Sequence, residues 1–91
     1  MDVIDRIKLL IEEEKLTRES LASITGVSYT RWQTVLNRKG KARHDDIEAL
    51  GKAFPNYAYW IAYGTEIPEA GQISPMTKKA QRDYRETGTD S

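Results

Sequence analysis

The feature that most constrains the fold is the segment 18–37, which reads RESLASITGVSYTRWQTVLN. Apolar residues recur at helical spacing on both sides of Gly26, with Leu21 and Ile24 before the glycine and Trp32 after it. Glycine suits the positive φ that a sharp turn between two helices usually requires. The segment therefore predicts two short helices joined by a tight turn at Gly26, with Leu21 and Ile24 pointing into the core.

Small and polar residues at defined places strengthen this prediction. Ala22 sits where the two helices would cross, and a larger side chain there would push them apart. Thr17 can cap the first helix and Ser28 the second, because their hydroxyl oxygens accept hydrogen bonds from backbone N–H groups of the first turn. Such a pair is a helix-turn-helix, which presents its second helix outward, where that helix can enter the major groove of DNA.

The rest of the chain also predicts helices. An opening helix, a fourth helix and a short fifth helix carry apolar stripes that would cover one core. The residues of these stripes are Val3, Ile4, Ile7, Leu10, Ile11, Ile47, Leu50, Phe54, Tyr57, Trp60 and Ile61. Gly51 would let another helix approach the fourth helix closely, and Pro55 would stop that helix. Asn56 would cap the fifth helix, and Gly64 would close it. We therefore predict an all-α fold, a compact five-helix bundle with a linker and a short helix after it.

We expect two parts in this chain. Residues 1–64 form the helix-turn-helix domain, and residues 65–91 form a linker and a C-terminal helical arm. A shift to proline, glycine and polar residues marks the linker. Met76, Ala80 and Tyr84 then make a narrow apolar stripe on a polar helix. Such a stripe is compatible with docking on the domain, with pairing across a dimer and with partial disorder.

The net charge of zero hides an uneven distribution. Residues 1–19 carry six acidic and four basic residues, and residues 45–91 carry eight acidic and five basic ones. Residues 20–44 carry five basic residues and no acidic one. A basic island of this kind is the electrostatic footprint of a protein that binds nucleic acid.

Composition excludes several classes of function. The chain has no cysteine, so disulfides, thiol catalysis and cysteine-based metal sites are ruled out. His44 is the one histidine, and the glutamates at 12–14 have no histidine cluster beside them, so we expect no metal site, no cofactor and no enzymatic activity. No apolar run approaches the ~20 residues that span a bilayer. We expect a cytoplasmic protein with no membrane partner.

The helix pair resembles a known family. With Ala22 at the crossing and Gly26 at the turn, it is similar to the Cro/phage-repressor (XRE-type) helix-turn-helix family, and the resemblance covers roughly Asp2–Gly64. The resemblance implies a five-helix bundle. Two residues depart from the family pattern. Trp32 stands where the family usually has isoleucine or valine, which implies a repacked neighbourhood, and Thr25 replaces the usual apolar residue before the glycine.

A second likeness lies in the segment 54–64, which reads FPNYAYWIAYG. It looks like the Tyr-Trp-Leu-containing fifth helix of small prophage-encoded regulators, including the repressors of filamentous prophages. An aromatic cluster at helical spacing usually packs in a core, and we expect this of Trp60. Tyr57, Tyr59 and Tyr63 cannot all face one core, so we expect some of them at a dimer interface, where tyrosine is favoured.

The second helix of the pair keeps a polar outer face once its apolar residues are assigned to the core. We expect base contacts from the residues of this face: Ser28, Tyr29, Thr30, Arg31, Gln33, Thr34 and Asn37. Glutamine and asparagine can pair bidentately with adenine, arginine can reach guanine or a phosphate, and threonine can meet a thymine methyl group. The family resemblance places base contacts at Tyr29, Thr30 and Thr34. After these three residues, the resemblance places a base contact at Gln33.

Basic residues flank this face. Four of them follow the second helix and are predicted to clamp phosphates: Arg38, Lys39, Lys41 and Arg43. Phosphate contacts set register and affinity without carrying sequence information. A mobile basic loop is the alternative interpretation. The family resemblance also places a phosphate contact at Arg18, which begins the first helix of the pair.

These features favour a sequence-specific transcriptional regulator. The resemblance implies a prophage-type repressor that binds a two-fold, double-stranded DNA operator as a homodimer. Two half-sites about one helical turn apart (~34–36 Å) would give the dimer the affinity and specificity that one half-site alone does not supply. The resemblance also implies that the bound dimer blocks RNA polymerase at an overlapping promoter. An antirepressor is one partner that would release it from DNA.

Two other functions remain open. In an antitoxin-like autoregulator, the same DNA-binding core would control an operon while residues 65–91 bind a toxin partner. In a protein-interaction module, the tyrosine and tryptophan surface would bind a protein, and the chain would bind no nucleic acid. A neighbouring toxin gene would favour the first of these, and failure to bind any DNA at low salt would favour the second.

Overall fold

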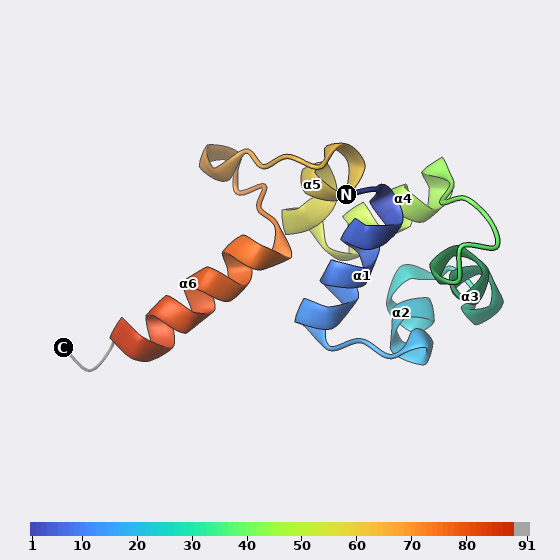
Figure 1. Cartoon of the computed structure of the whole chain (residues 1–91), viewed down its shortest axis with the longest axis horizontal. Coiled ribbons are helices and arrows are strands. Elements are labelled where there is room, and N and C mark those ends of the chain that lie inside the picture. Colours follow the sequence, from blue (N-terminus) through green and yellow to red (C-terminus); the bar gives the residue numbers. More distant parts are fainter. Residues whose placement is uncertain (89–91) are drawn as a thin grey trace.

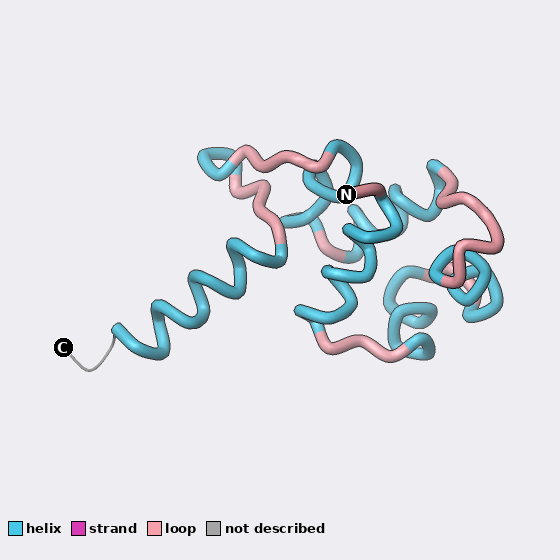
Figure 2. The backbone as a smooth tube through the Cα atoms, viewed as in Figure 1, coloured by secondary structure: helices cyan, strands magenta, loops and turns pink. Residues whose placement is uncertain are grey.

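A computed structural model describes residues 1–88 of the chain, with side chains as far as residue 85. The helices follow one another as α1 (Val3–Glu14), α2 (Arg18–Thr25), α3 (Tyr29–Leu36), α4 (His44–Ala53), the 3-10 turn η1 (Pro55–Tyr57), α5 (Ala58–Tyr63), the 3-10 turn η2 (Pro68–Ala70) and α6 (Pro75–Gly88). Figure 1 shows α1 to α5 gathered in a bundle, from which α6 extends. Helices joined by loops make up the described residues (Figure 2), so the predicted all-α fold is confirmed.

Local sequence sets the ends of the helices. Thr17 accepts a hydrogen bond from the backbone N–H of Ser20, and the Ser20 hydroxyl accepts one from the Thr17 N–H, which closes a reciprocal cap on α2. Ser28 caps α3 through the N–H of Arg31. Gly26 ends α2 in the left-handed conformation, with a φ of 74°. The predicted caps at Thr17 and Ser28 and the predicted turn at Gly26 are therefore confirmed.

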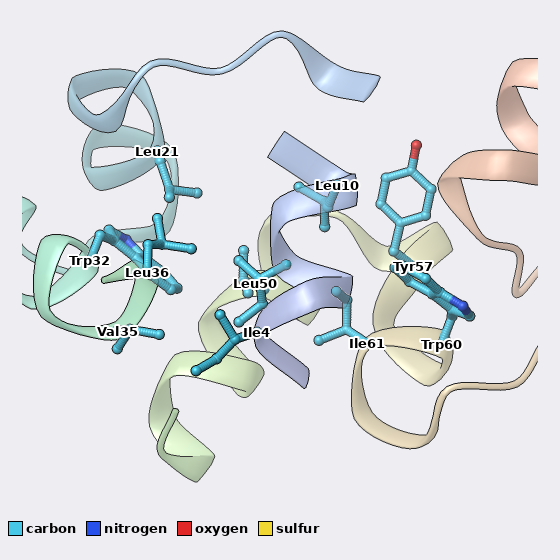
Figure 3. Close-up of a cluster of buried hydrophobic side chains, with 11 residues drawn as sticks. Ile4, Leu10, Leu21, Trp32, Val35, Leu36, Leu50, Tyr57, Trp60 and Ile61 are labelled. Carbon is cyan, nitrogen blue, oxygen red and sulfur yellow. The ribbon is translucent and has the colours of Figure 1, made fainter. Parts of the chain in front are cut away.

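The core joins all five helices of the bundle (Figure 3). Its buried residues are Ile4, Ile7, Leu10, Leu21, Trp32, Val35, Leu36, Leu50, Tyr57, Trp60 and Ile61. Ile47 and Phe54 pack against this cluster and are partly buried. One prediction is wrong: Ile24 is 49% exposed, because α2 buries only Leu21 and turns its last turn toward a groove beside α4.

The helices α4 and α5 pack closely because Gly51 has no side chain. A Cβ placed on Gly51 would lie 3.2 Å from the Cβ of Ala58, so the predicted close approach at this glycine is confirmed. The prediction that Asn56 caps the fifth helix is wrong. Asn56 lies inside η1, which Pro55 begins, and α5 starts without a side-chain cap. The carbonyl oxygen of Asn56 instead accepts a hydrogen bond from the N–H of Ile73, 2.9 Å away.

Polar contacts attach α6 to α1. Lys78 donates to Glu14 at 2.6 Å, and Arg82 pairs with Glu13. Tyr57 also donates to Glu14, at 2.8 Å. Burial alone would raise the pKa of Glu14, but the hydrogen bonds from Lys78 and Tyr57 outweigh burial and hold this pKa below its ordinary value. Glu14 is therefore ionised at neutral pH, where it joins α1, η1 and α6.

The apolar stripe of α6 does not dock on the bundle. Met76 is 48% exposed and Tyr84 is 77% exposed, and Ala80 between them is exposed as well. The buried residues at the start of the helix are Ser74 and Pro75. In Figure 1, α6 leaves the bundle beside α1 and α5, on the side away from α3. The sequence left three arrangements open for this stripe: docking on the domain, pairing across a dimer and partial disorder. In the described residues the stripe does not dock on the domain.

Candidate nucleic-acid interface

The helices α2 and α3 lie at the edge of the bundle with the outer side of α3 facing away from it (Figure 1). At the start of α3, Ser28, Tyr29 and Thr30 are exposed, and Tyr29 keeps 43% of its surface. At its end, Asn37 is exposed. Gln33 and Thr34 are partly buried. The residues of the sequence-predicted face are thus exposed at both ends of α3 and partly buried between them.

A hydrogen bond links Trp32 and Thr25, the two residues that depart from the Cro/phage-repressor pattern that the sequence resembles. Trp32 is fully buried, and its indole Nε1 donates to the hydroxyl oxygen of Thr25 at 3.0 Å. That hydroxyl donates in turn to the carbonyl oxygen of Leu21 at 2.7 Å. A buried indole N–H needs an acceptor, and an apolar residue before Gly26 would offer none. Trp32 and Thr25 are therefore complementary, and together they seat α3 on α2.

Arg31 points back into the protein rather than away from it. Its guanidinium donates twice to the Asp46 carboxylate, at 3.3 Å from Nε and 2.7 Å from Nη2. Nη2 also donates to the carbonyl oxygen of Lys41 at 2.8 Å. The hydrogen bond to Asp46 raises the pKa of Arg31 above its ordinary value. Asp46 is 3% exposed and lies in the first turn of α4, and the sequence did not predict it as a residue of the site.

The Arg31–Asp46 pair holds the loop after α3 in place. Asp46 also accepts from the backbone N–H of Arg43 at 2.8 Å, so one carboxylate joins α3, the loop and α4. Gly40 packs under α3, since a Cβ there would lie 3.0 Å from the Cγ2 of Thr34. The loop that carries Lys41 is thereby fixed beside the polar face of α3.

The predicted phosphate residues differ in their surroundings. Arg38, with a φ of 57°, pairs with Asp2 at 2.8 Å and with Asp5 at 2.6 Å, so much of its charge is balanced by α1. A hydrogen bond from the Asp5 N–H, together with Arg38, holds the pKa of Asp2 below its ordinary value. Three other cations are exposed and form no salt bridge with any described side chain; they are Lys39, Lys41 and Arg43. Uncompensated positive charge therefore remains on the loop beside α3.

Arg18 and Gln33 meet across the helix pair. The Nε of Arg18 donates to the Oε1 of Gln33 at 2.8 Å. Arg18 is the first residue of α2, where the helix dipole favours an acidic side chain over a basic one. Its position is thus better explained by the partner it contacts than by the stability of α2.

The described residues hold neither a metal-binding cluster nor a membrane-spanning helix. No group of three or more histidine, cysteine, aspartate or glutamate side chains within them has a geometry that would hold a metal ion. No helix in residues 1–88 is both long and apolar enough to cross a membrane. The polar face of α3 and the cations beside it bring hydrogen-bonding groups and positive charge together on one surface, which suits a nucleic acid as ligand.

Comparisons with known proteins place this geometry in a family. No protein-family model matches the chain, and no curated protein matches it. Among solved structures, the chain is similar to Pf6r from the filamentous phage Pf6 of Pseudomonas aeruginosa PA01. The TM-score is 0.76 and the identity 30%, and the match covers 93% of this chain and 99% of Pf6r. The chain belongs to the same family as Pf6r of filamentous phage Pf6.

Proposed function

We propose that the protein is a sequence-specific DNA-binding transcriptional regulator, a repressor of the prophage type. The observation that carries this proposal is the polar outer face of α3 beside three exposed cations of an acid-free segment. A helix-turn-helix reads bases with the second helix and holds phosphates with the residues around it. The similarity to Pf6r supports a filamentous-phage setting, because Pf6r comes from such a phage.

Base reading is proposed for five residues of the α3 face. Tyr29 and Thr30 lie at the N-terminal end of α3, which enters the groove deepest in this motif. Ser28, Thr34 and Asn37 complete the proposed set. Arg31 and Gln33 already have charged partners within the protein, so base reading is assigned to the other five.

The proposal is tested most simply at Tyr29. Tyr29→Ala is expected to cost about 1–3 kcal/mol of binding free energy on the cognate duplex and much less on random DNA, because a base contact is lost and a phosphate contact is not. Tyr29 is exposed, so the change should leave folding intact. Titration of both duplexes by fluorescence anisotropy measures the two losses. Equal losses on both would remove Tyr29 from the base-reading set.

Phosphate binding is proposed for Lys39, Lys41 and Arg43, with Arg18 and Arg38 at the edges of the surface. Replacing Lys39 and Lys41 together by glutamine is expected to weaken binding to every duplex alike. The slope of log K against log salt should fall by about 1.8, since each phosphate contact releases about 0.9 counterion. Titrations at several salt concentrations measure the slope. Lys8→Gln together with Lys52→Gln, which changes the charge equally but on α1 and α4, is the matched control. An unchanged slope in the Lys39 and Lys41 variant would contradict the assignment.

We also propose that the regulator acts as a homodimer. Tyr63 is 70% exposed, and its ring packs against the ring of Tyr59 at a tilt of 44°, with centroids 4.8 Å apart. It stands beside a groove between α4 and α5, which Ile47, Gly51, Ala58 and Ala62 line in part. The exposed stripe of α6 is the other candidate surface. A two-fold operator requires a two-fold protein, so the symmetry of the bound DNA site tests the dimer.

An antitoxin-like autoregulator is the second candidate, and the exposed stripe of α6 favours it. Met76 and Tyr84 remain accessible on a helix that is joined to α1 mainly by ion pairs. A toxin or an antirepressor would bind such a stripe with apolar contacts. A toxin gene beside the gene for this chain, with loss of toxin neutralisation in a Met76→Asp variant that still binds DNA, would favour the antitoxin.

A further inference from the structure

Arg18 and Gln33 link the two helices of the helix-turn-helix by a side-chain hydrogen bond. The donor is Nε of Arg18, the acceptor is Oε1 of Gln33, and the two atoms lie 2.8 Å apart. Both residues are partly buried. An N–H donor faces the oxygen of an amide and not its NH2 group, so Arg18 fixes which way round the Gln33 amide lies. The amide oxygen faces Arg18, and the NH2 group lies on the other side.

This orientation limits what Gln33 can read. Bidentate recognition of adenine needs the glutamine oxygen to accept from N6 while the NH2 group donates to N7. The oxygen of Gln33 already accepts a charge-assisted hydrogen bond, which is stronger than a neutral one. One lone pair of this oxygen remains, so to read adenine Gln33 would have to accept from N6 beside the guanidinium of Arg18, in the orientation that this bond fixes.

The same hydrogen bond orients Arg18. A guanidinium has five N–H donors in one plane, and with Nε engaged by Gln33, four donors remain on the two Nη groups. No salt bridge between described side chains involves Arg18. A planar pair of Nη groups matches two oxygens of one phosphate. Because the bond to Gln33 already restricts the rotamers of Arg18, less conformational entropy is lost when the phosphate binds.

We propose that Gln33 is a positioning residue, which holds the Arg18 guanidinium against a DNA phosphate at the edge of the groove that α3 enters, and that Gln33 reads no base. This inference rests on the proposed DNA-binding function. It assigns to Gln33 a role in affinity and none in sequence preference, and it makes Arg18 and Gln33 a single unit.

The test compares the wild type with Gln33→Met, Arg18→Ala and the double variant. Methionine has the length of glutamine but lacks the acceptor oxygen. Gln33→Met is expected to weaken binding by about 3- to 10-fold on the cognate and on a random duplex alike, and to select the same sequence from random DNA as the wild type. Arg18→Ala should lower the salt slope by about one. The double variant should bind as well as Arg18→Ala alone, because Gln33 acts through Arg18.

Thr34→Ala is the matched control, since Thr34 is the next residue on α3 and belongs to the proposed base readers. It should change the base selected at one position of the site. Thermal unfolding checks each variant, and Gln33→Ser, which is too short to reach Arg18, replaces Gln33→Met if the latter is unfolded. A changed base preference in the Gln33 variant, or losses that multiply in the double variant, would overturn the inference. If the wild type still selects one sequence, either of these results overturns only the role of Gln33, and the proposed DNA-binding function stands. A wild type that selects no sequence would overturn the role of Gln33 and the proposed function together.

Discussion

Replacing Trp32 by alanine is expected to lower the free energy of unfolding by about 3–5 kcal/mol, which is the usual cost of truncating a large buried aromatic side chain. Trp32 is fully buried, and it contributes to the core cluster that includes Leu21 and Leu36 (Figure 3). Small domains have roughly 5–15 kcal/mol in total, so much of the stability would be lost. Urea unfolding followed by circular dichroism measures the change.

Two milder variants separate the packing of Trp32 from its hydrogen bond. Thr25→Val keeps the shape of the side chain but leaves the indole N–H without its acceptor, and should cost about 1–3 kcal/mol. In a Trp32→Phe background no indole N–H remains, so the same change should cost much less. The difference between the two costs measures the bond. Equal costs in both backgrounds would show that Thr25 and Trp32 are not coupled, and a Trp32→Ala loss below about 1 kcal/mol would contradict the burial of Trp32.

Replacing Asp46 by alanine is the second change with a large expected effect. Asp46 is 3% exposed and accepts from the guanidinium of Arg31 and from the N–H of Arg43. Its loss leaves these donors without their acceptor, and we expect the free energy of unfolding to fall by about 2–3 kcal/mol. The expected loss is smaller than for a fully buried ion pair, because the Arg31 side chain keeps 18% of its surface in solvent. Thermal unfolding at neutral pH measures the loss.

Asp46→Asn is the matched control for this prediction. Asparagine keeps an oxygen that can accept from Arg43 but removes the negative charge that balances Arg31. The free energy of unfolding of Asp46→Asn should therefore lie between those of the wild type and Asp46→Ala. If Asp46→Ala is as stable as the wild type, the carboxylate does not hold the loop to α3, and the placement of Lys41 beside the polar face loses its support.

The fold could be predicted largely from local signals. Apolar spacing and the caps at Thr17 and Ser28 defined the helix pair, and glycine at position 26 marked its turn. Local signals failed where a neighbouring element decides the outcome. Ile24 has helical spacing with Leu21, but α4 leaves a groove there, so Ile24 stays exposed. Asn56 has the chemistry of a cap, but Pro55 begins a 3-10 turn that takes Asn56 into it.

Less of the candidate site could be predicted, because its partners are distant in sequence. Arg31 and Asp46 are separated by 15 residues, as are Arg18 and Gln33. A count of charges in one segment treats Arg31 and Arg38 as free cations, whereas the folded chain pairs them with Asp46 and with Asp2 and Asp5. One signal was present in the sequence. A tryptophan that replaces an aliphatic core residue needs an acceptor for its N–H, and Thr25 was the other departure from the family pattern.

Selection of bound sequences from a pool of random duplex DNA, at one fixed salt concentration, tests the central claim most directly. Sequence-specific recognition by α3 in a homodimer predicts enrichment of one two-fold symmetric site, with half-site centres about 10–10.5 base pairs apart. A single unrepeated half-site would contradict the homodimer and leave DNA reading in place. A pool that remains random, although the protein binds it at low salt, would contradict sequence-specific recognition itself.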